Sequence, residues 1–460
     1  MITADDNLLT GLDEVDWANL NHAYGTAADV PGQLRALCGD DEQARQQAVS
    51  SLFDHLAHQG TRCQASPYAV PFLARIALAG PDPAREHALE LLTGLAVNWD
   101  EEREITDGAD IAAWRAEAAE NSSDKLLPLY EEALAAEQDE QRRLNLQDIR
   151  DWVAAGNPVD ARDSSMRSYN AVLAELPALR GLLDDENPRV RTRTAYLLTW
   201  FPELAGTSLP LLLGLAAHED DAVAKATSLV AVGILGTTAL PGTLTASLDA
   251  EDGLVRWAAA IAIAQTARSA AAELDGPLLD RAVAELAAAA AAPAPVPATD
   301  YSLGDFHGHT ADILLALPPS PTSRAAVAAC LPSVSTSQRA SKAEAVLPDV
   351  FPSPCPTPDP RTRTSPAPSS SFCMPSLTSL KDGGTRRRAW ARASPLTDFR
   401  PLTQTCARTS GFPRSTTGAG RRKSEHADGA HTWELPCRSR DCSMPESLTW
   451  VWGGWALSRC

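Results

Sequence analysis

The chain has 460 residues, enough for two or three ordinary domains, and a formal net charge of −19. That charge is divided unevenly, because residues 1–317 carry 21 Lys and Arg against 49 Asp and Glu, whereas residues 318–460 carry 19 against 10. A strongly acidic first part repels phosphate backbones, which argues against nucleic acid as its partner, and no apolar run reaches the roughly 18 to 20 residues that span a bilayer.

The first residues and the cysteines indicate where the protein works. The N-terminus has neither the basic region nor the apolar region of a secretory signal. Only Cys38 and Cys63 precede residue 318, which favours a reducing compartment and no disulfide framework. We therefore expect a cytoplasmic protein that does not enter the membrane.

Five segments of the first part share one pattern. Each begins with an apolar residue followed by proline, and a second apolar segment starts 13 or 14 residues after that proline, in most cases behind an acidic turn. The prolines are Pro31, Pro71, Pro177, Pro210 and Pro241, and the second segments begin at Ala44, Ala84, Val190, Val223 and Val255. Proline suits the first turn of a helix, and Asp or Asn in the acidic turn caps the next helix. The pattern predicts five helix pairs, each led by a proline.

The predicted pairs follow one another at intervals of 32 to 40 residues where they are consecutive, and a single pair cannot bury its own apolar face. We expect an all-α fold, a right-handed α-solenoid of stacked antiparallel helix pairs over residues 1–317 with a curved concave face. Residues 98–167 form an irregular insertion, a loop with one or two degenerate repeats, and have helical pieces near 111–120 and 125–155. Further helices are expected at 276–291 and 305–317, with a linker at 292–298.

The start of each second segment resembles a HEAT repeat. An apolar residue and Arg follow the acidic turn in four of the five segments, with Ala close behind, and the arginines are Arg45, Arg85, Arg191 and Arg256. In the HEAT family such arginines form ladders with Asp between stacked repeats, so the resemblance implies a ladder here. The segment at Val223 departs from it, with Ala224 in the place of Arg.

More narrowly, the chain resembles a group of HEAT-repeat proteins that is common in actinobacteria and largely uncharacterised. The matching stretches are Val15-Asp16-Trp17, His22-Ala23-Tyr24-Gly25, Asp29-Val30-Pro31, His58-Gln59-Gly60-Thr61, Ala69-Val70-Pro71-Phe72-Leu73 and Ala195-Tyr196-Leu197-Leu198. The resemblance covers about residues 10–317, with Cys63 where an aromatic residue is expected. It implies a fold and no settled activity.

Four residues of these stretches are candidate site residues, namely Trp17, Tyr24, His58 and Gln59. In one interpretation they are structural, because Trp17, Leu20 and Tyr24 would share one face of a helix that caps the first repeat. In the other, they line a ligand groove or a partner surface at the N-terminal end.

The histidines offer few metal ligands. His55 and His58 are spaced i, i+3 on one predicted helix face, and a zinc site needs three or four ligands. Deoxyhypusine hydroxylases place metal chemistry on a HEAT scaffold with repeated His-Glu pairs, whereas this chain has one such pair, His218-Glu219. His87 stands alone, and His307-Gly-His309 is predicted to be a loop pair at a helix entry. We expect no metal, no cofactor and no catalytic residue.

From Pro318 onward the helical periodicity vanishes, and 18 of the chain's 34 prolines fall in this last third. Such a segment buries too little apolar surface to offset its ordering entropy, so residues 318–460 are predicted to be a disordered tail. The abrupt rise of Arg, Ser, Pro, Cys and Trp together is typical of GC-rich DNA read out of frame. The alternative is a genuine basic tail, and translating the other two frames beyond codon 317 separates the two.

The tail carries two further patterns. Two cysteines and two histidines resemble a zinc knuckle without fitting a strong template, and two basic runs suit nucleic acid or the acidic first part. The residues are Cys437, Cys442, His426 and His431, and the runs are Arg386–Arg388 and Arg421–Lys423. An out-of-frame tail would leave all of them without meaning.

These observations predict a non-catalytic scaffold or regulatory module that binds a protein partner, a basic one if its acidic surface masks a cationic protein. The alternative is a HEAT-scaffold enzyme of the lyase or metal-dependent hydroxylase type. A cluster of His and carboxylates in the concave groove would favour the enzyme. The sequence leaves the oligomeric state, the biological process and the identity of the partner open.

Overall fold

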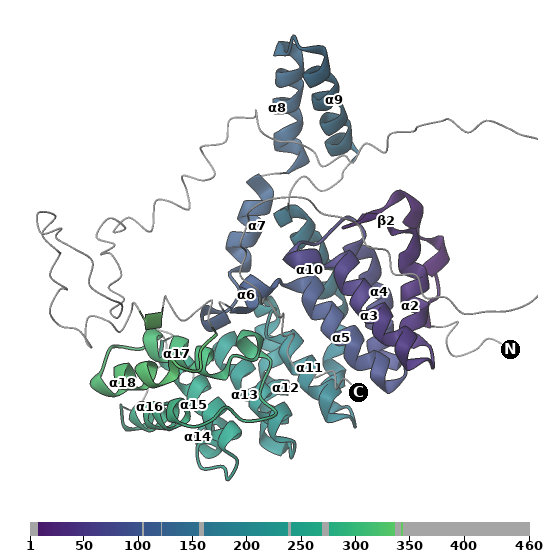
Figure 1. Ribbon diagram of the computed structural model, residues 1–460. Coiled ribbons are helices and arrows are strands. Elements are labelled where there is room, and N and C mark those ends of the chain that lie inside the picture. The colour runs from purple at the N-terminus through teal and green to yellow at the C-terminus, as the bar shows by residue number, and fades with distance from the viewer. Residues whose placement is uncertain are drawn as a thin grey trace, which may run out of the picture. The chain divides into compact units, whose positions relative to one another are not determined.

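The computed structural model describes residues 8–103, 105–120, 122–155, 161–237, 241–268, 276–335 and 342–343. The regular secondary structure of this part is helical except for one short hairpin, which confirms the predicted all-α class (Figure 1). The α-helices are α2 (Val30–Cys38), α3 (Glu42–Leu56), α4 (Ser66–Ala79), α5 (Asp82–Ala96), α6 (Trp99–Arg103), α7 (Ile111–Glu120), α8 (Ser123–Ala136), α9 (Glu140–Ala154), α10 (Ala161–Leu179), α11 (Pro188–Leu198), α12 (Ala205–His218), α13 (Ala222–Leu235), α14 (Gly242–Ser247), α15 (Gly253–Arg268), α16 (Gly276–Ala291), α17 (Phe306–Ala316) and α18 (Pro321–Cys330). Within these ranges, none of the helices has the length and apolar character needed to cross a membrane.

Short non-α elements complete the chain. The 3₁₀ helices are η1 (Leu12–Glu14), η2 (Trp17–Asn19), η3 (Ala27–Asp29), η4 (His58–Gly60), η5 (Ile105–Asp107), η6 (Arg180–Asp184), η7 (Pro202–Leu204) and η8 (Tyr301–Gly304). The strands β1 (Asn21–His22) and β2 (Gly25–Thr26) pair antiparallel, with Asn21 opposite Thr26 and His22 opposite Gly25.

Helices that follow one another along the chain pack side by side. The packed neighbours include α2 with α3, α4 with α5, α8 with α9, α12 with α13 and α14 with α15. Because only Gly80 and Pro81 join α4 to α5, these two helices run in opposite directions. Contacts also link each pair to the next, since α10 packs on α4 and α5, α11 on α5, α13 on α11, α15 on α13 and α16 on α15.

Acidic and amide side chains begin the second helix of most pairs, as the turn sequences predict. Asp41 accepts hydrogen bonds from the backbone N–H groups of α3, Asn187 from that of α11, Asp221 from those of α13 and Asp252 from those of α15. These caps satisfy N–H groups that have no partner within the helix. The local sequence therefore fixes where these helices start.

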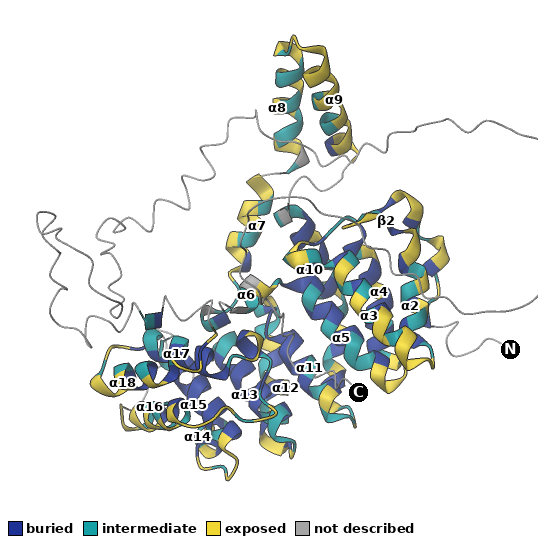
Figure 2. Ribbon diagram, in the orientation of Figure 1, coloured by how far each residue is buried: buried dark blue, intermediate teal, exposed yellow. Residues whose placement is uncertain are grey.

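The core is continuous from the first residues described to α18, and α13 and α15 are buried along most of their length (Figure 2). Their close approach depends on Gly233, because a Cβ atom there would lie 2.6 Å from the Cα atom of Ala262. Close packing at native density leaves no room for such an atom.

Three of the five prolines do not lead their helices, which corrects the predicted helix starts. Pro31 is at the start of α2 and Pro241 precedes α14, but Pro71, Pro177 and Pro210 lie inside α4, α10 and α12. The apolar residues that precede two of them, Val70 and Leu176, are fully buried. The burial of these residues stabilises the helical turns that precede Pro71 and Pro177, although each proline removes one backbone hydrogen bond from its helix.

The predicted insertion at residues 98–167 contains the helices α6, α7, α8 and α9 and the start of α10. Its second helical piece is two helices, because α8 ends at Ala136 and Asp139 then caps α9 by accepting from the N–H of Arg142 at 3.0 Å. The last residues of the predicted insertion belong to α10, which begins at Ala161 and packs on α4 and α5.

Helical packing also continues beyond residue 317, where the sequence predicts disorder. Helix α18 (Pro321–Cys330) starts with a capping box between Ser320 and Ser323 and packs on α16 and α17. Its Val327 and Cys330 are buried, and Lys342 pairs with Asp312 of α17. The predicted boundary at residue 317 is therefore too early. Residues 336–341 and 344–460, with the zinc-knuckle pattern and the basic runs, lie outside the described residues.

Candidate functional site

Five side chains from separate elements meet near the N-terminal end of the described chain. They are His22 of β1, Tyr24 in the turn of the hairpin, Asp29 at the end of η3, His55 near the end of α3 and His58 of η4. We call this group the histidine cluster. The hairpin is held against α3 by the backbone N–H of Ala23, which donates to the carbonyl of His55 at 3.1 Å.

Asp29 is the centre of the histidine cluster. One carboxylate oxygen lies 3.0 Å from Nε2 of His22 and the other lies 3.1 Å from Nδ1 of His55. Gln33, one helical turn further along α2, places its Nε2 atom 2.9 Å from Asp29 and 2.9 Å from Nδ1 of His55. A carboxylate at the start of α2 also suits the positive end of that helix's dipole.

The two imidazoles of His22 and His55 stack on each other, with ring centroids 4.2 Å apart and planes inclined by 21°. Burial, and then the proximity of His22, lower the pKa of His55, against the opposing charges of Asp29 and Asp54. The His55 ring is therefore held in its neutral form near pH 7, with a lone pair available on one nitrogen.

Tyr24 and His58, two of the predicted site residues, are in direct contact. The Tyr24 hydroxyl lies 3.1 Å from Nδ1 of His58, and 64% of Tyr24 is exposed. The backbone N–H of Tyr24 donates to Nδ1 of His22 at 3.0 Å. Gln59 is exposed beside them, in a left-handed conformation with φ 48°, which is rare for a residue other than glycine.

Two predicted arrangements around these residues are wrong. Trp17 and Tyr24 do not share a helix face, because η2 ends at Asn19 and Tyr24 lies in a β-hairpin turn. His55 and His58 do not share one helix, because α3 ends at Leu56. The left-handed backbone at Gly25, Gln59 and Gly60 breaks the helical period that the spacing of these side chains suggested.

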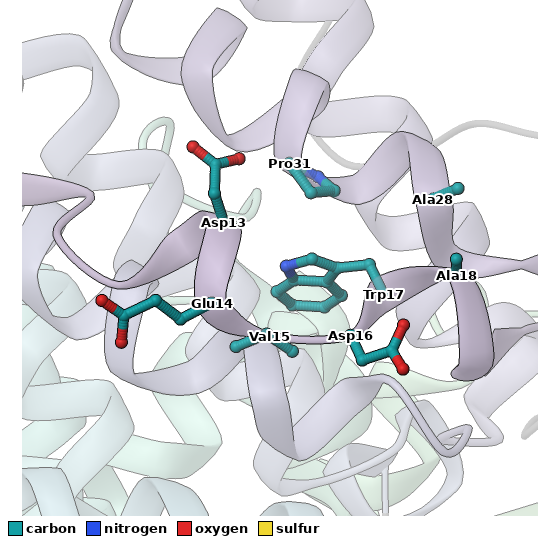
Figure 3. Close-up of a pocket in the computed structure, with 8 residues that line it drawn as sticks. All are labelled: Asp13, Glu14, Val15, Asp16, Trp17, Ala18, Ala28 and Pro31. Atoms are coloured by element: carbon teal, nitrogen blue, oxygen red, sulfur yellow. The ribbon is translucent and has the colours of Figure 1, made fainter.

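Trp17 is apart from the histidine cluster and has a packing role. It is 4% exposed, its indole N–H donates to the carbonyl of Leu12 at 2.8 Å, and its ring contacts Phe72 at 6.2 Å between centroids. The same ring helps to line an open hollow of about 420 Å³ (Figure 3). The residues lining this hollow are Asp13, Glu14, Val15, Asp16, Trp17, Ala18, Ala28 and Pro31. We call it the acidic hollow.

Two of the predicted ladder arginines reach the following helix pair. Arg85 of α5 forms an ion pair with Asp185, which precedes α11. Arg191 of α11 donates twice to Glu219, at 2.6 and 2.7 Å, just before α13. Burial raises the pKa of Glu219, but the hydrogen bonds from Arg191 outweigh it and leave the pKa below its ordinary value. Both carboxylates are therefore charged partners.

The other two ladder arginines differ from each other. Arg256 of α15 donates to Glu285 of α16 at 2.9 Å, which again links neighbouring helices. Arg45 donates to the carbonyl of Gly39 at 2.8 Å, within its own helix pair. Ala224, where the sequence lacks the arginine, is buried in α13.

A second group of charges lies around Arg193 of α11. The guanidinium of Arg193 donates to Asp300 at 2.7 Å. Burial, followed by the like charge of Asp300, raises the pKa of Glu102 in α6 to about 8, against the opposing effects of Arg193 and of a hydrogen bond from Tyr196. Glu102 is therefore a neutral carboxylic acid at pH 7.

His307 and His309 lie inside α17, which corrects the predicted loop pair. Nε2 of His307 is 2.9 Å from the carbonyl oxygen of Ala292. His309 is fully buried between the rings of Trp257 and Tyr301, and burial lowers its pKa to about 3. Both positions are those of core residues.

The sequence pointed to Tyr24, His55 and His58 but not to the residues that join them. His22, Asp29 and Gln33 become neighbours only through the β-hairpin and the start of α2. One signal was present, because His22, Asp29 and His58 all fall in the short stretches that carry the family resemblance. Three nitrogen and oxygen donors from His22, Asp29 and His55 are thus available to a metal ion.

Comparison with protein-family models and with curated proteins gives no match. Among solved structures, the crystal structure of an engineered protein aligns with 69% of this chain and 81% of its own length, at 16% identity and a TM-score of 0.22. A likeness with so low a TM-score carries no argument about fold or function.

Proposed function

We propose that this protein is a non-catalytic scaffold, built as a HEAT-type α-solenoid, that binds a basic segment of a protein partner. The observation that carries the proposal is the acidic hollow, where Asp13, Glu14 and Asp16 line one opening and the Asp13 carboxylate also pairs with Arg35. Lysine and arginine side chains combine an apolar stem with a cationic end, which a carboxylate attracts. The hollow offers its carboxylates to the cation and the apolar side chains of Val15, Ala28 and Pro31 to the stem.

Two features support the repeat architecture of the scaffold. Apart from α6 to α9, the helices from α4 to α16 contact their successors in chain order, so that each pair covers an apolar face of the next. Ion pairs from Arg85, Arg191 and Arg256 connect successive pairs or helices at equivalent positions. Residues 1–317 contain 49 Asp and Glu but 21 Lys and Arg. This excess of negative charge supports a basic partner over an acidic one.

The enzyme alternative is favoured by one observation, the convergence of two histidines and a carboxylate in the histidine cluster. The single His-Glu pair of the hydroxylase pattern gives it no support, because Glu219 is occupied by Arg191 and His218 is exposed beside it. A lyase or hydroxylase would need a substrate pocket at the cluster, and the hollow lined by Trp17 includes none of its residues.

The proposal is tested with the full chain immobilised and exposed to native lysate, followed by mass spectrometry. We expect a partner with a basic binding segment, retained at about 0.1 M salt and released near 1 M, because the screening length falls from about 10 to 3 Å. Each captured protein is then purified, and its affinity for the chain is measured by calorimetry.

Two charge-matched variants locate the binding surface. The first neutralises the acidic hollow, and the second neutralises three exposed carboxylates of α8. Their substitutions are Asp13→Asn, Glu14→Gln and Asp16→Asn in the first, and Asp124→Asn, Glu131→Gln and Glu132→Gln in the second. We expect the first to lose the partner and the second to keep it. Equal retention by both variants, or the absence of any salt-sensitive partner, would contradict the proposal.

A further inference from the structure

We propose that the histidine cluster binds one divalent transition-metal ion through Nε2 of His22, Nδ1 of His55 and the carboxylate of Asp29. The donor atoms all lie within 4.8 Å of one another, and they come from three different elements of the fold. The inference is independent of the scaffold proposal, because the cluster and the acidic hollow share no residue.

The spacing of the donors suits a small ion. An ion held at about 2.0 to 2.2 Å from each of three ligands in tetrahedral geometry keeps those ligands roughly 3.3 to 3.6 Å apart. The carboxylate oxygens of Asp29 lie 3.0 and 3.1 Å from the nitrogens of His22 and His55. Each of these two separations reaches the tetrahedral value after a movement of a few tenths of an ångström. The two oxygens belong to one carboxylate and no two donor atoms are more than 4.8 Å apart, so side-chain rotations can bring all three ligands around one ion.

The fourth ligand is the amide of Gln33. Its oxygen is buried without a hydrogen-bond partner, while its nitrogen faces Asp29 and His55 at 2.9 Å. A rotation of the amide by 180° exchanges its oxygen and nitrogen. Which of the two atoms faces the cluster is decided by the hydrogen-bond partners present, so an added ion can reverse the orientation. With an ion present, the amide oxygen faces the positive charge and becomes a ligand.

Metal binding requires one proton to move within His22. Because the N–H of Tyr24 donates to Nδ1 of His22, the ring proton that faces Asp29 is on Nε2. The ion takes the Nε2 lone pair, the proton moves to Nδ1, and the Tyr24 N–H turns away to solvent. The cost is the hydrogen bonds from the Tyr24 N–H to Nδ1 and from Nε2 to Asp29, together with the two that the Gln33 amide nitrogen makes before it turns.

The ligand set selects the class of metal. Two imidazoles and one carboxylate suit Zn²⁺, Co²⁺ and Ni²⁺, whereas Ca²⁺ and Mg²⁺ take sets made almost entirely of oxygen. Cys63 is near His55 but does not compete, because burial raises the pKa of its thiol and its Sγ atom donates to the carbonyl of His55 at 3.4 Å. An ion can enter past Asp29, whose side chain is 48% exposed.

The test is a titration of the full chain with Co²⁺ after treatment with a chelator, followed by calorimetry, visible absorption and thermal unfolding. Binding at a folded site raises the melting temperature, whereas binding to a segment that takes no part in unfolding does not. We expect one site with the comparatively strong visible bands of tetrahedral Co²⁺ bound by nitrogen and oxygen, and a melting temperature that rises with the concentration of Co²⁺.

Three variants identify the ligands. Asp29→Asn and His55→Gln are expected to weaken Co²⁺ binding at least tenfold and to abolish the thermal shift. His218→Gln, at an exposed histidine outside the cluster, is expected to behave as the original chain. Circular dichroism without metal establishes whether each variant is folded. If His55→Gln does not fold, Asp29→Asn still tests the proposal, because the Asp29 side chain is half-exposed and its replacement should leave the fold intact. An unchanged thermal shift in Asp29→Asn, or no shift in the original chain, overturns the proposal.

Discussion

Replacement of Glu102 by Gln tests whether the group of charges around Arg193 holds a neutral carboxylic acid. Glu102 is partly buried beside Arg193, Asp300 and Tyr196, and its pKa is about 8 instead of the ordinary 4.5. Between these two values the folded protein retains a proton that the unfolded chain has lost. The free energy of unfolding therefore falls as pH rises from 4.5 to 8, and no further change from this group follows above pH 8.

The size of the effect follows from the interval between the two pKa values. Each pH unit within it lowers the free energy of unfolding by about 1.4 kcal/mol, so the whole interval amounts to roughly 4 to 5 kcal/mol. A glutamine has nearly the same shape, can accept the hydrogen bond from Tyr196 and has no proton to lose. The Glu102→Gln variant should therefore become more stable, relative to the original chain, as pH rises.

The assay is urea unfolding followed by circular dichroism at pH 5, 6, 7 and 8. The difference in unfolding free energy between Glu102→Gln and the original chain is expected to be small at pH 5 and several kcal/mol at pH 8. Glu131→Gln, at an exposed position of α8, serves as the control and should keep a constant difference. Parallel pH profiles for Glu102→Gln and the original chain would refute the reasoning, because they would mean that Glu102 ionises near its ordinary pKa.

Other substitutions test packing and ion pairs by thermal and urea unfolding. Gly233→Ala places a methyl group 2.6 Å from the backbone of α15 and should destabilise the protein by about 1–2 kcal/mol, whereas Gly214→Ala, in open space, should stabilise it by up to about 1 kcal/mol. Equal effects would contradict the packing argument. Arg191→Ala leaves the carboxylate of Glu219, 3% exposed, without its partner and should cost about 3 kcal/mol, against less than about 1 kcal/mol for Arg281→Ala in an exposed pair. A small loss for Arg191→Ala would mean that Glu219 finds water or another donor.

The sequence predicted those parts of the fold that depend on neighbours along the chain. The caps at Asp41, Asn187, Asp221 and Asp252 are local, because each side chain binds N–H groups two or three residues further on. Helix type and many helix starts follow from such contacts. The arginine positions also follow a local pattern, but their carboxylate partners, such as Glu285 for Arg256, depend on how helices pack.

The sequence did not predict features that depend on contacts between distant segments. Pro71 lies inside α4 because buried neighbours hold the turn before it. The histidine cluster joins residues up to 36 positions apart, and Tyr24 reaches His58 only because a two-strand hairpin replaces the expected helix. The neutral state of Glu102 likewise depends on Asp300, nearly 200 residues away in the chain.

Helix α18 decides where a shortened version of this protein should end. If the chain stopped at residue 317, before α18, the faces of α16 and α17 that Val327 and Cys330 cover would be open to water. Newly exposed aliphatic surface of this kind promotes aggregation, which would be mistaken for intrinsic instability of the helical core. A chain that ends after Ala343 retains α18 on these faces, together with the contact between Lys342 and Asp312. A change of reading frame, if the gene has one, is likewise better sought downstream of the codon for Cys330.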